Sequence, residues 1–151
     1  MLLAGDIGGT KTNLAVYMPA QSVRTTLFEA TFQSGDYATL ESLVHDFMKR
    51  VKVNIVAASF GVAGPVVSGK ATITNLPWII EEKQLRSTLN LSTVYLLNDL
   101  EAIATAVPSL ERSDLYTLNE GQAEEGGAIA IITRAHALKG VQVDIVGNRQ
   151  A

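Results

Sequence analysis

The chain has no cysteine and few charged side chains, and both shortages exclude classes of protein. Without cysteine it can form no disulfide, thiolate nucleophile, iron–sulfur cluster or cysteine-rich zinc site. Charged residues make up 18% of the 151 residues and apolar residues 47%, a balance that excludes a disordered chain. The 15 acidic and 12 basic side chains give a net charge of −3, so the basic face of a general nucleic-acid binder is missing.

Long apolar runs are missing too. No run approaches the ~18 apolar residues of a membrane span. The start, Met-Leu-Leu-Ala-Gly-Asp, has no basic segment and reaches an aspartate at position 6, which excludes a signal peptide. We therefore expect a cytoplasmic protein that binds neither membrane nor nucleic acid, and the lack of cysteine fits a reducing compartment.

Short apolar runs separated by turn residues predict a meander at the start of the chain. We expect strands over Leu2–Gly5, Asn13–Tyr17 and Thr25–Phe32. A helix then opens at Asp36 or Thr39, and Lys49–Arg50 suits its C-terminus because the helix dipole favours cations there. Its apolar positions follow the helical spacing: Leu40, Leu43, Val44 and Phe47.

The rest of the chain alternates strands with helices. The expected strands are Val53–Ala58, Val94–Leu97 and Ala128–Ile132, the expected helices are Ile79–Leu89 and Leu100–Ala106 before Pro108, and a hairpin spans Val66–Thr74. The β-β-β-α-β-α-β-α order predicts an α/β layer fold with a mixed sheet.

The strongest chemical signal is the stretch Gly5–Thr12, GDIGGTKT, which joins the first two strands. Its glycines allow positive φ and a close approach of a ligand, and successive N–H groups in such a turn form a nest for phosphate oxygens. Thr10 and Thr12 add hydroxyl donors, and Lys11 adds a cation. Since a carboxylate beside a phosphate is repulsive without a cation between them, Asp6 predicts Mg²⁺, held through water.

Other interpretations of this stretch are open. It nearly matches a P-loop, with Thr10 where the second glycine belongs, but a P-loop must continue into a helix and Asn13–Tyr17 is predicted as a strand. The G-x-G-x-x-G pattern of dinucleotide-binding folds is absent. On the glycines alone, an ordinary hairpin turn explains the stretch equally well. Asp6 and the threonines favour phosphate binding.

A second candidate is the pair Asn98 and Asp99, which follows a buried strand directly. Ligands of open α/β sheets gather at the carboxyl ends of strands, so Asp99 is expected to face a cleft. Helix capping is the alternative, because Asn98 with Glu101 fits a capping box, and the residues alone favour it. Both roles can coexist. Trp78, after Pro77, is expected to be a hydrophobic anchor rather than a sugar-stacking platform.

Four stretches, in this order, resemble the bacterial-type glucokinases, sugar kinases of the actin, hexokinase and heat-shock-chaperone ATPase superfamily. Leu3–Ala15 resembles the first phosphate motif, and Phe60–Pro65 resembles the loop lining the sugar pocket. Thr74–Trp78 resembles the segment whose asparagine reaches a sugar hydroxyl, and Leu97–Ala102 resembles the catalytic stretch. The resemblance extends over about residues 2–132.

The resemblance implies an actin-like ATPase (ribonuclease H-like) fold and transfer of the ATP γ-phosphate to the primary hydroxyl of glucose. The residues it assigns to ATP are Gly5, Asp6, Ile7, Gly8, Gly9 and Thr10. It places Asn75, Asn98 and Asp99 on the sugar, with Asp99 as the catalytic base. Mg²⁺ at Asp6 and a homodimer are also expected. Another hexose or N-acyl-sugar kinase and a non-catalytic sugar- or partner-binding fragment are the alternatives.

The resemblance also divides the chain. Residues 1–120 would form the N-terminal domain, and 121–132 a linker with the first strand of a second domain. Residues 133–151 have no counterpart in the family, and neither its second phosphate loop nor its adenosine loop follows. We therefore expect this chain alone to be inactive. A change of reading frame after codon 132 and a natural half-protein are the two explanations left open.

Overall fold

The computed structural model describes residues 1–18, 24–122, 127, 129–134 and 141–146. The chain forms two compact units, Met1–Asp99 and Leu100–Ala151. The predicted boundaries after residues 120 and 132 stay a prediction. No helix of the described residues is long and apolar enough to cross a membrane.

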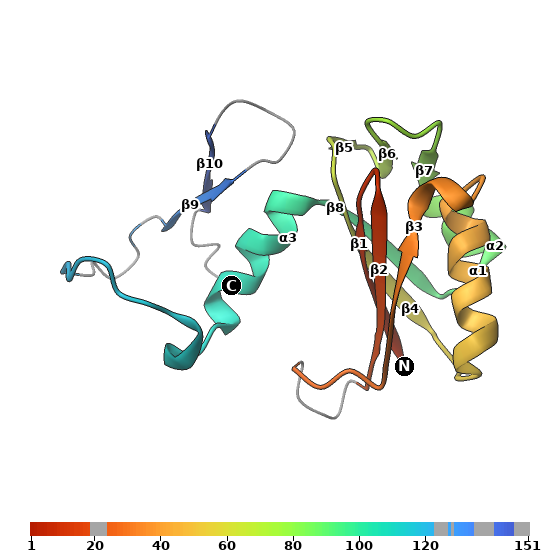
Figure 1. Cartoon of the computed structure of the whole chain (residues 1–151), viewed down its shortest axis with the longest axis horizontal. Coiled ribbons are helices and arrows are strands. Elements are labelled where there is room, and N and C mark those ends of the chain that lie inside the picture. Colours follow the sequence, from red (N-terminus) through yellow and green to blue (C-terminus); the bar gives the residue numbers. More distant parts are fainter. Residues whose placement is uncertain (19–23, 123–126, 128, 135–140, 147–151) are drawn as a thin grey trace. The chain divides into compact units, whose positions relative to one another are not determined.

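A five-stranded mixed sheet forms the centre of the first unit, in the order β3-β2-β1-β4-β8 (Figure 1). Its strands are β1 (Leu2–Ile7), β2 (Lys11–Tyr17), β3 (Phe28–Gln33), β4 (Ala57–Val62) and β8 (Thr93–Asn98). The first three pair antiparallel, which confirms the predicted meander, and β4 pairs parallel with both β1 and β8. The predicted mixed sheet is therefore confirmed.

Two helices, α1 (Leu40–Val51) and α2 (Glu82–Thr88), cover one face of this sheet (Figure 1). Of the two predicted starts, Thr39 is confirmed, because its side chain accepts the N–H of Ser42 and caps α1. The four apolar positions predicted for α1 are all buried. They pack with alternate residues of the strands, among them Leu3, Leu14, Phe60 and Val62.

Strand alternation gives the sheet its second face. Leu3 and Ile7 of β1 are buried in the core, so Asp6 between them lies on the opposite face. The same alternation buries Leu14 and leaves Asn13 exposed. Each fully buried Leu, Ile, Val or Phe side chain contributes ~1.5–3 kcal/mol relative to an exposed one. Burial of the apolar set therefore fixes which face carries Asp6.

A small three-stranded sheet follows β4. Its strands are β5 (Val66–Val67), β6 (Lys70–Thr72) and β7 (Ile79–Glu81). Ser68 (φ 52°) and Gly69 (φ 71°) form the turn between β5 and β6, and positive φ at both central residues suits the twist of a tight hairpin. The hairpin predicted around these two residues is confirmed.

The bounds of three predicted elements are clearly wrong. β3 begins at Phe28, whereas the strand was predicted from Thr25. β4 spans Ala57–Val62, whereas the strand was predicted over Val53–Ala58. The predicted helix Ile79–Leu89 starts as strand β7, because Ile79–Glu81 pairs with β6, and only Glu82–Thr88 is helical. Glu82 also accepts the N–H of Leu96 on β8, at 2.8 Å. Trp78 is 2% exposed and donates its indole N–H to the carbonyl of Tyr37, which confirms the anchor.

The second unit contains the rest of helix α3 (Asp99–Ala106), two short 3-10 turns and a two-stranded sheet. Pro108 lies in the first 3-10 turn, so the predicted end of α3 is confirmed. β9 (Ile129–Arg134) matches the predicted strand, whose first residue, Ala128, lies outside the described residues. β10 (Val141–Val146) pairs antiparallel with β9 and was not predicted.

Candidate active site

The three parallel strands of the first unit end at one edge of the sheet. Ile7 of β1 is in register with Val62 of β4, which is in register with Asn98 of β8. The segments that follow them, the hairpin at Gly8, the loop Ala63–Pro65 and Asp99, therefore start side by side. The carboxyl edge of parallel strands is where open α/β sheets bind ligands.

The hairpin after β1 needs glycine because neighbouring backbone lies so close. A Cβ atom at Gly8 would lie 2.8 Å from the carbonyl oxygen of Lys11, and one at Gly9 would lie 2.6 Å from that of Thr74. Gly8 and Gly9 do not use the positive φ that glycine allows, since among the described glycines only Gly69 has it. Close approach rather than backbone freedom selects glycine here.

Ser34 holds the carbonyl groups of this hairpin. Its hydroxyl donates to the carbonyl of Gly8 at 2.8 Å, and its N–H donates to the carbonyl of Thr10 at 2.9 Å. Within the residues that the structure describes, the N–H groups of Gly9 and Thr10 donate to no backbone carbonyl. Two donors therefore stay at the tip for an anion. Sequence reasoning missed Ser34, because a single serine after a strand carries no signal.

Thr12 has a different role from the one predicted. Alternation along β2 turns it to the core face, where it is fully buried with its hydroxyl 3.0 Å from the hydroxyl of Ser34. It therefore braces the hairpin and cannot be a phosphate donor. Thr10 and Lys11 are exposed, as a ligand-binding role requires.

Gly5 and Ile7 lie inside β1 rather than at the tip. A Cβ atom at Gly5 would lie 2.6 Å from the ring of Phe60, and Ile7 is fully buried. Any contact of these two residues with a nucleotide is therefore made by their backbone. Core packing explains both the lack of a Cβ at Gly5 and the buried side chain of Ile7.

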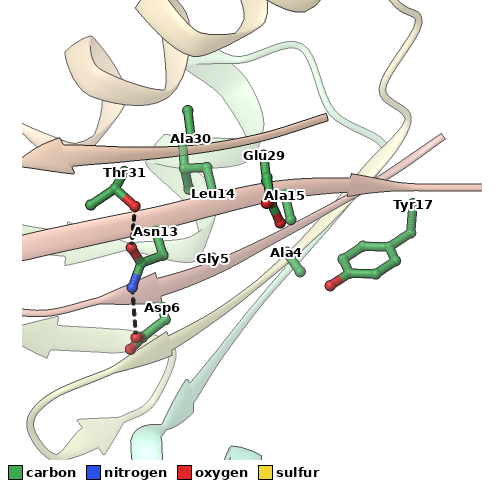
Figure 2. A pocket seen from close by; sticks show the side chains of 10 residues that line it. All are labelled: Ala4, Gly5, Asp6, Asn13, Leu14, Ala15, Tyr17, Glu29, Ala30 and Thr31. Atoms are coloured by element: carbon green, nitrogen blue, oxygen red, sulfur yellow. Dashed lines mark hydrogen bonds between the residues drawn. The ribbon is translucent and has the colours of Figure 1, made fainter. Parts of the chain in front are cut away.

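Asp6 lies on the exposed face and borders a pocket of about 640 Å³ between β1, β2 and β3 (Figure 2). The amide Nδ2 of Asn13 donates to its Oδ2 at 3.2 Å, and the hydroxyl of Thr31 donates to the Oδ1 of Asn13 at 2.8 Å. The pocket is lined by neither Asn98 nor Asp99. It is thus a feature of the Asp6 face and not of the whole strand-end edge.

The donor chemistry around Asp6 fits Mg²⁺ that arrives with a nucleotide. The described residues contain no group of three or more His, Cys, Asp or Glu side chains that could hold a metal. Mg²⁺ does not need such a cage, because it keeps several waters and binds one or two carboxylates together with substrate phosphates. A single exposed carboxylate on the strand that leads into the hairpin fits that mode.

Asn98 ties the end of β8 to the loop after β4. Its Nδ2 donates to the carbonyl of Gly64 at 2.9 Å. It directly precedes Asp99, the first residue of α3, and so occupies the predicted cap position. The stretch Phe60–Pro65, predicted as a loop, is strand up to Val62 and loop only from Ala63.

Asn75 is exposed and has φ 73°. Asparagine tolerates this left-handed conformation better than most residues. The preceding residue, Thr74, is the one whose carbonyl lies against Gly9. The structure thus brings together the glycine hairpin, the Asn75 segment, the loop at Gly64 and Asn98, and Asp99 follows Asn98 directly.

Solved structures share this arrangement of elements. A glucokinase from an Antarctic psychrotroph superposes with a TM-score of 0.77 at 23% identity, over 98% of this chain and 49% of its own. A ROK family glucokinase from Streptomyces griseus, in complex with glucose and AMPPNP, superposes with a TM-score of 0.61 at 21% identity, over 99% of this chain and 45% of its own. The chain has the actin-like ATPase fold of these sugar kinases.

Comparison of the sequence identifies a single family within this fold. The Glucokinase family model matches residues 3–137, and the chain belongs to that family. Glucokinase of Trichormus variabilis is 39% identical over 137 residues, covering 87% of this chain and 40% of its own length. Glucokinase of Nostoc punctiforme is 34% identical over 134 residues, covering 87% and 39%. The chain spans about 40% of the length of these relatives.

Proposed function

We propose that this chain forms the N-terminal nucleotide- and sugar-binding part of an ATP-dependent glucokinase. The enzyme transfers the ATP γ-phosphate to the primary hydroxyl of glucose and gives glucose 6-phosphate. The observation that carries the proposal is the meeting of the glycine hairpin, the Asn75 segment and the Asn98–Asp99 end of β8 at one sheet edge. We further propose that the enzyme is cytoplasmic and a homodimer.

The proposed mechanism relies on position and charge, because the transition state of phosphoryl transfer is loose. Asp99 accepts the proton of the glucose hydroxyl as the hydroxyl oxygen attacks the γ-phosphorus and the bond from that phosphorus to ADP breaks. Such proton acceptance contributes about 10²–10⁴ in rate. Asn75 and Asn98 bind other hydroxyls and orient the sugar. An amide suits this role, since it offers both a donor and an acceptor.

The phosphates of ATP would lie on the hairpin. The N–H groups of Gly9 and Thr10 point to phosphate oxygens, and Ser34 keeps the neighbouring carbonyls away from them. When bound, Mg²⁺ neutralises charge on the phosphates. Asp6 would hold it through water, as a single carboxylate does when the phosphates supply other ligands.

A fused enzyme tests this proposal. Residues 1–132 would be joined to the part of Trichormus variabilis glucokinase that follows its match to this chain, and ADP release would be measured with Mg²⁺ and ATP. We expect turnover that requires glucose. Other hexoses and N-acetylmannosamine serve as competing substrates. Faster turnover of one of these would replace glucose in the proposal, and no turnover with any sugar would contradict it.

A further inference from the structure

A row of three polar side chains crosses the exposed face of the sheet. Asp6 of β1 is the direct cross-strand partner of Asn13 on β2, which is the direct partner of Thr31 on β3. The three side chains line one wall of the pocket and are linked by hydrogen bonds (Figure 2). Direct cross-strand neighbours are the closest contacts that a sheet provides.

The hydrogen bonds of this row have a direction. The hydroxyl of Thr31 donates to the Oδ1 of Asn13, so the oxygen end of the amide faces Thr31 and its NH₂ end faces Asp6. Turning the amide over would place its oxygen against the carboxylate and take the acceptor away from the hydroxyl of Thr31, so Asp6 and Thr31 both favour the observed orientation. Thr31 therefore reinforces the orientation of Asn13, and the NH₂ group of Asn13 holds the carboxylate of Asp6.

We propose that Asn13 and Thr31 are positioning residues for the Mg²⁺-binding carboxylate of Asp6. Donation from Asn13 to Oδ2 holds Asp6 in one rotamer and leaves Oδ1 to accept from water on Mg²⁺. This inference rests on the proposed function, and neither residue contacts the nucleotide. Outer partners that orient a metal-binding carboxylate typically change metal affinity about 10–100-fold when they are removed.

The surroundings of the row support this assignment. The next row on the same face pairs Ala4 with Ala15 and Ala15 with Glu29. The alanines have no polar side-chain atom, and Glu29 accepts from Thr26 at 3.5 Å. Among the residues that line the pocket, Asn13 is the one whose side chain donates to Asp6.

The test uses the 151-residue chain and magnesium tripolyphosphate, which offers Mg²⁺ and phosphates without adenosine. Binding is followed by NMR as shifts of the Gly9 and Thr10 amide signals, and the Asp6 rotamer is followed by three-bond couplings to its Cγ. Asn13→Leu and Thr31→Val remove the two donors while keeping the side-chain size. Thr31→Ser restores the hydroxyl, and Glu29→Gln is a matched control on the same strand and face.

In the Asn13→Leu variant, we expect the Asp6 side chain to average over several rotamers. The affinity of this variant for magnesium tripolyphosphate should fall about tenfold. Thr31→Val should lower the affinity about threefold, as loss of one neutral hydrogen bond predicts. Thr31→Ser and Glu29→Gln should behave like the wild type. Both altered positions are exposed, so the fold should persist, and the same spectra would show this.

Two different failures can be told apart. If Asp6→Asn weakens binding but Asn13→Leu and Thr31→Val do not, the positioning role is overturned and the proposed function stands. If the wild-type hairpin signals do not respond to magnesium tripolyphosphate, or Asp6→Asn binds it equally well, the Mg²⁺ role of Asp6 fails and this inference fails with it.

Discussion

Gly9 lies so close to the Asn75 segment that its substitution should disturb two parts of the site together. A Cβ atom there would lie 2.6 Å from the Thr74 carbonyl oxygen, whereas one at Gly35 would meet nothing within 4 Å. We expect Gly9→Ala to lower the free energy of unfolding by about 1–3 kcal/mol, as overpacking does. Gly35→Ala should leave it unchanged or raise it by up to about 1 kcal/mol. Urea unfolding of the 151-residue chain measures both, and equal stability of the two variants would contradict the close contact.

The closeness of Gly9 to the Thr74 carbonyl also changes the result expected for Gly9→Val. Phosphate binding alone predicts that Gly9→Val weakens ATP binding far more than glucose binding. Since Gly9 supports the segment that carries Asn75, we now expect both to weaken in the fused enzyme. Asp6→Asn is the cleaner test of the phosphate side, because the described hydrogen bond of the Asp6 carboxylate is with Asn13 on the exposed face and not with that segment.

Asp99 is the residue on which the proposed chemistry depends. In the fused enzyme, Asp99→Asn should lower kcat by about 10²-fold or more, because the amide cannot accept the hydroxyl proton. The KM for glucose should change little, since the amide keeps an acceptor and the shape of the carboxylate. Steady-state assays separate the two parameters. Activity within a few-fold of the unsubstituted enzyme would instead make Asp99 a helix residue with no catalytic role.

At the scale of elements, a cluster of Tyr37, which precedes α1, with Asp46 and Arg50 of α1 links that helix to β3 and to the Asn75 segment. The hydroxyl of Tyr37 donates to the carboxylate of Asp46 at 2.8 Å, and Arg50 donates to the same carboxylate. The guanidinium of Arg50 also lies 5.1 Å from the centre of the Phe32 ring. The carbonyl of Tyr37 accepts the indole N–H of Trp78. The cluster therefore connects α1 with the loop that bears Asn75.

This cluster makes stability depend on pH at both extremes. The hydrogen bond from Tyr37, with that from Arg50, holds the pKa of Asp46 below its usual 3.8. The same bond to Asp46, followed by burial and the charge of Asp46, raises the pKa of Tyr37 above 10.0. The stabilisation by Asp46 is present above its unfolded pKa and is lost as the pH falls through its lower native pKa. The stabilisation by Tyr37 is present below its unfolded pKa of 10.0, and it is lost as the pH rises through the higher pKa of the native state.

Tyr37→Phe should therefore lower stability at neutral pH and flatten both ends of the stability–pH curve. Urea unfolding at acidic, neutral and alkaline pH measures this. Tyr95→Phe is the matched control, because Tyr95 is an exposed tyrosine on β8. A Tyr37→Phe curve parallel to that of the wild type would mean that the hydrogen bond does not contribute in solution.

How far the sequence predicts an element depends on what holds that element. The amphipathic spacing and the threonine cap of α1 are local, so the predicted face and start agree with the structure. β4 is different, because its buried positions Ala58, Phe60 and Val62 alternate with small residues, while the more continuous apolar run lies before it. Ile79–Glu81 was predicted as the start of a helix but forms strand β7. Its pairing with β6 outweighs the helical preference of the local sequence.

The site shows the same limit. The hairpin, Asn75, Asn98 and Asp99 were predicted from motifs. The register of β1, β4 and β8 brings the hairpin and the Asn98–Asp99 segment to one edge, and the closeness of Gly9 to the Thr74 carbonyl adds the Asn75 segment. Thr12 was wrongly predicted as a phosphate donor. The face of the sheet on which its side chain lies depends on the alternation along β2 and not on the motif. The roles of Ser34, Asn13 and Thr31 come from cross-strand contacts, which no local pattern contains.

At the scale of the whole molecule, the chain supplies one side of the proposed cleft. The first unit carries the hairpin and Asp99, and the chain spans about 40% of the length of its relatives. We expect the 151-residue chain to show no glucose-dependent ADP release, because each missing set of preorganised donors costs about 10²–10³ in rate. The fused enzyme is the positive control. Turnover by the chain comparable with the fused enzyme would mean that its second unit, or a second copy, completes the cleft.

The carboxylate of Glu82 has a consequence for how copies of the molecule behave in solution. β8 is the outermost strand of the five-stranded sheet, and such a strand offers unpaired N–H groups to strands of other molecules. Glu82 already occupies the N–H of Leu96 in the middle of β8, and it places a negative charge at that rim. An incoming strand would have to displace this carboxylate, so the rim of the sheet is protected against the edge-to-edge stacking that begins aggregation.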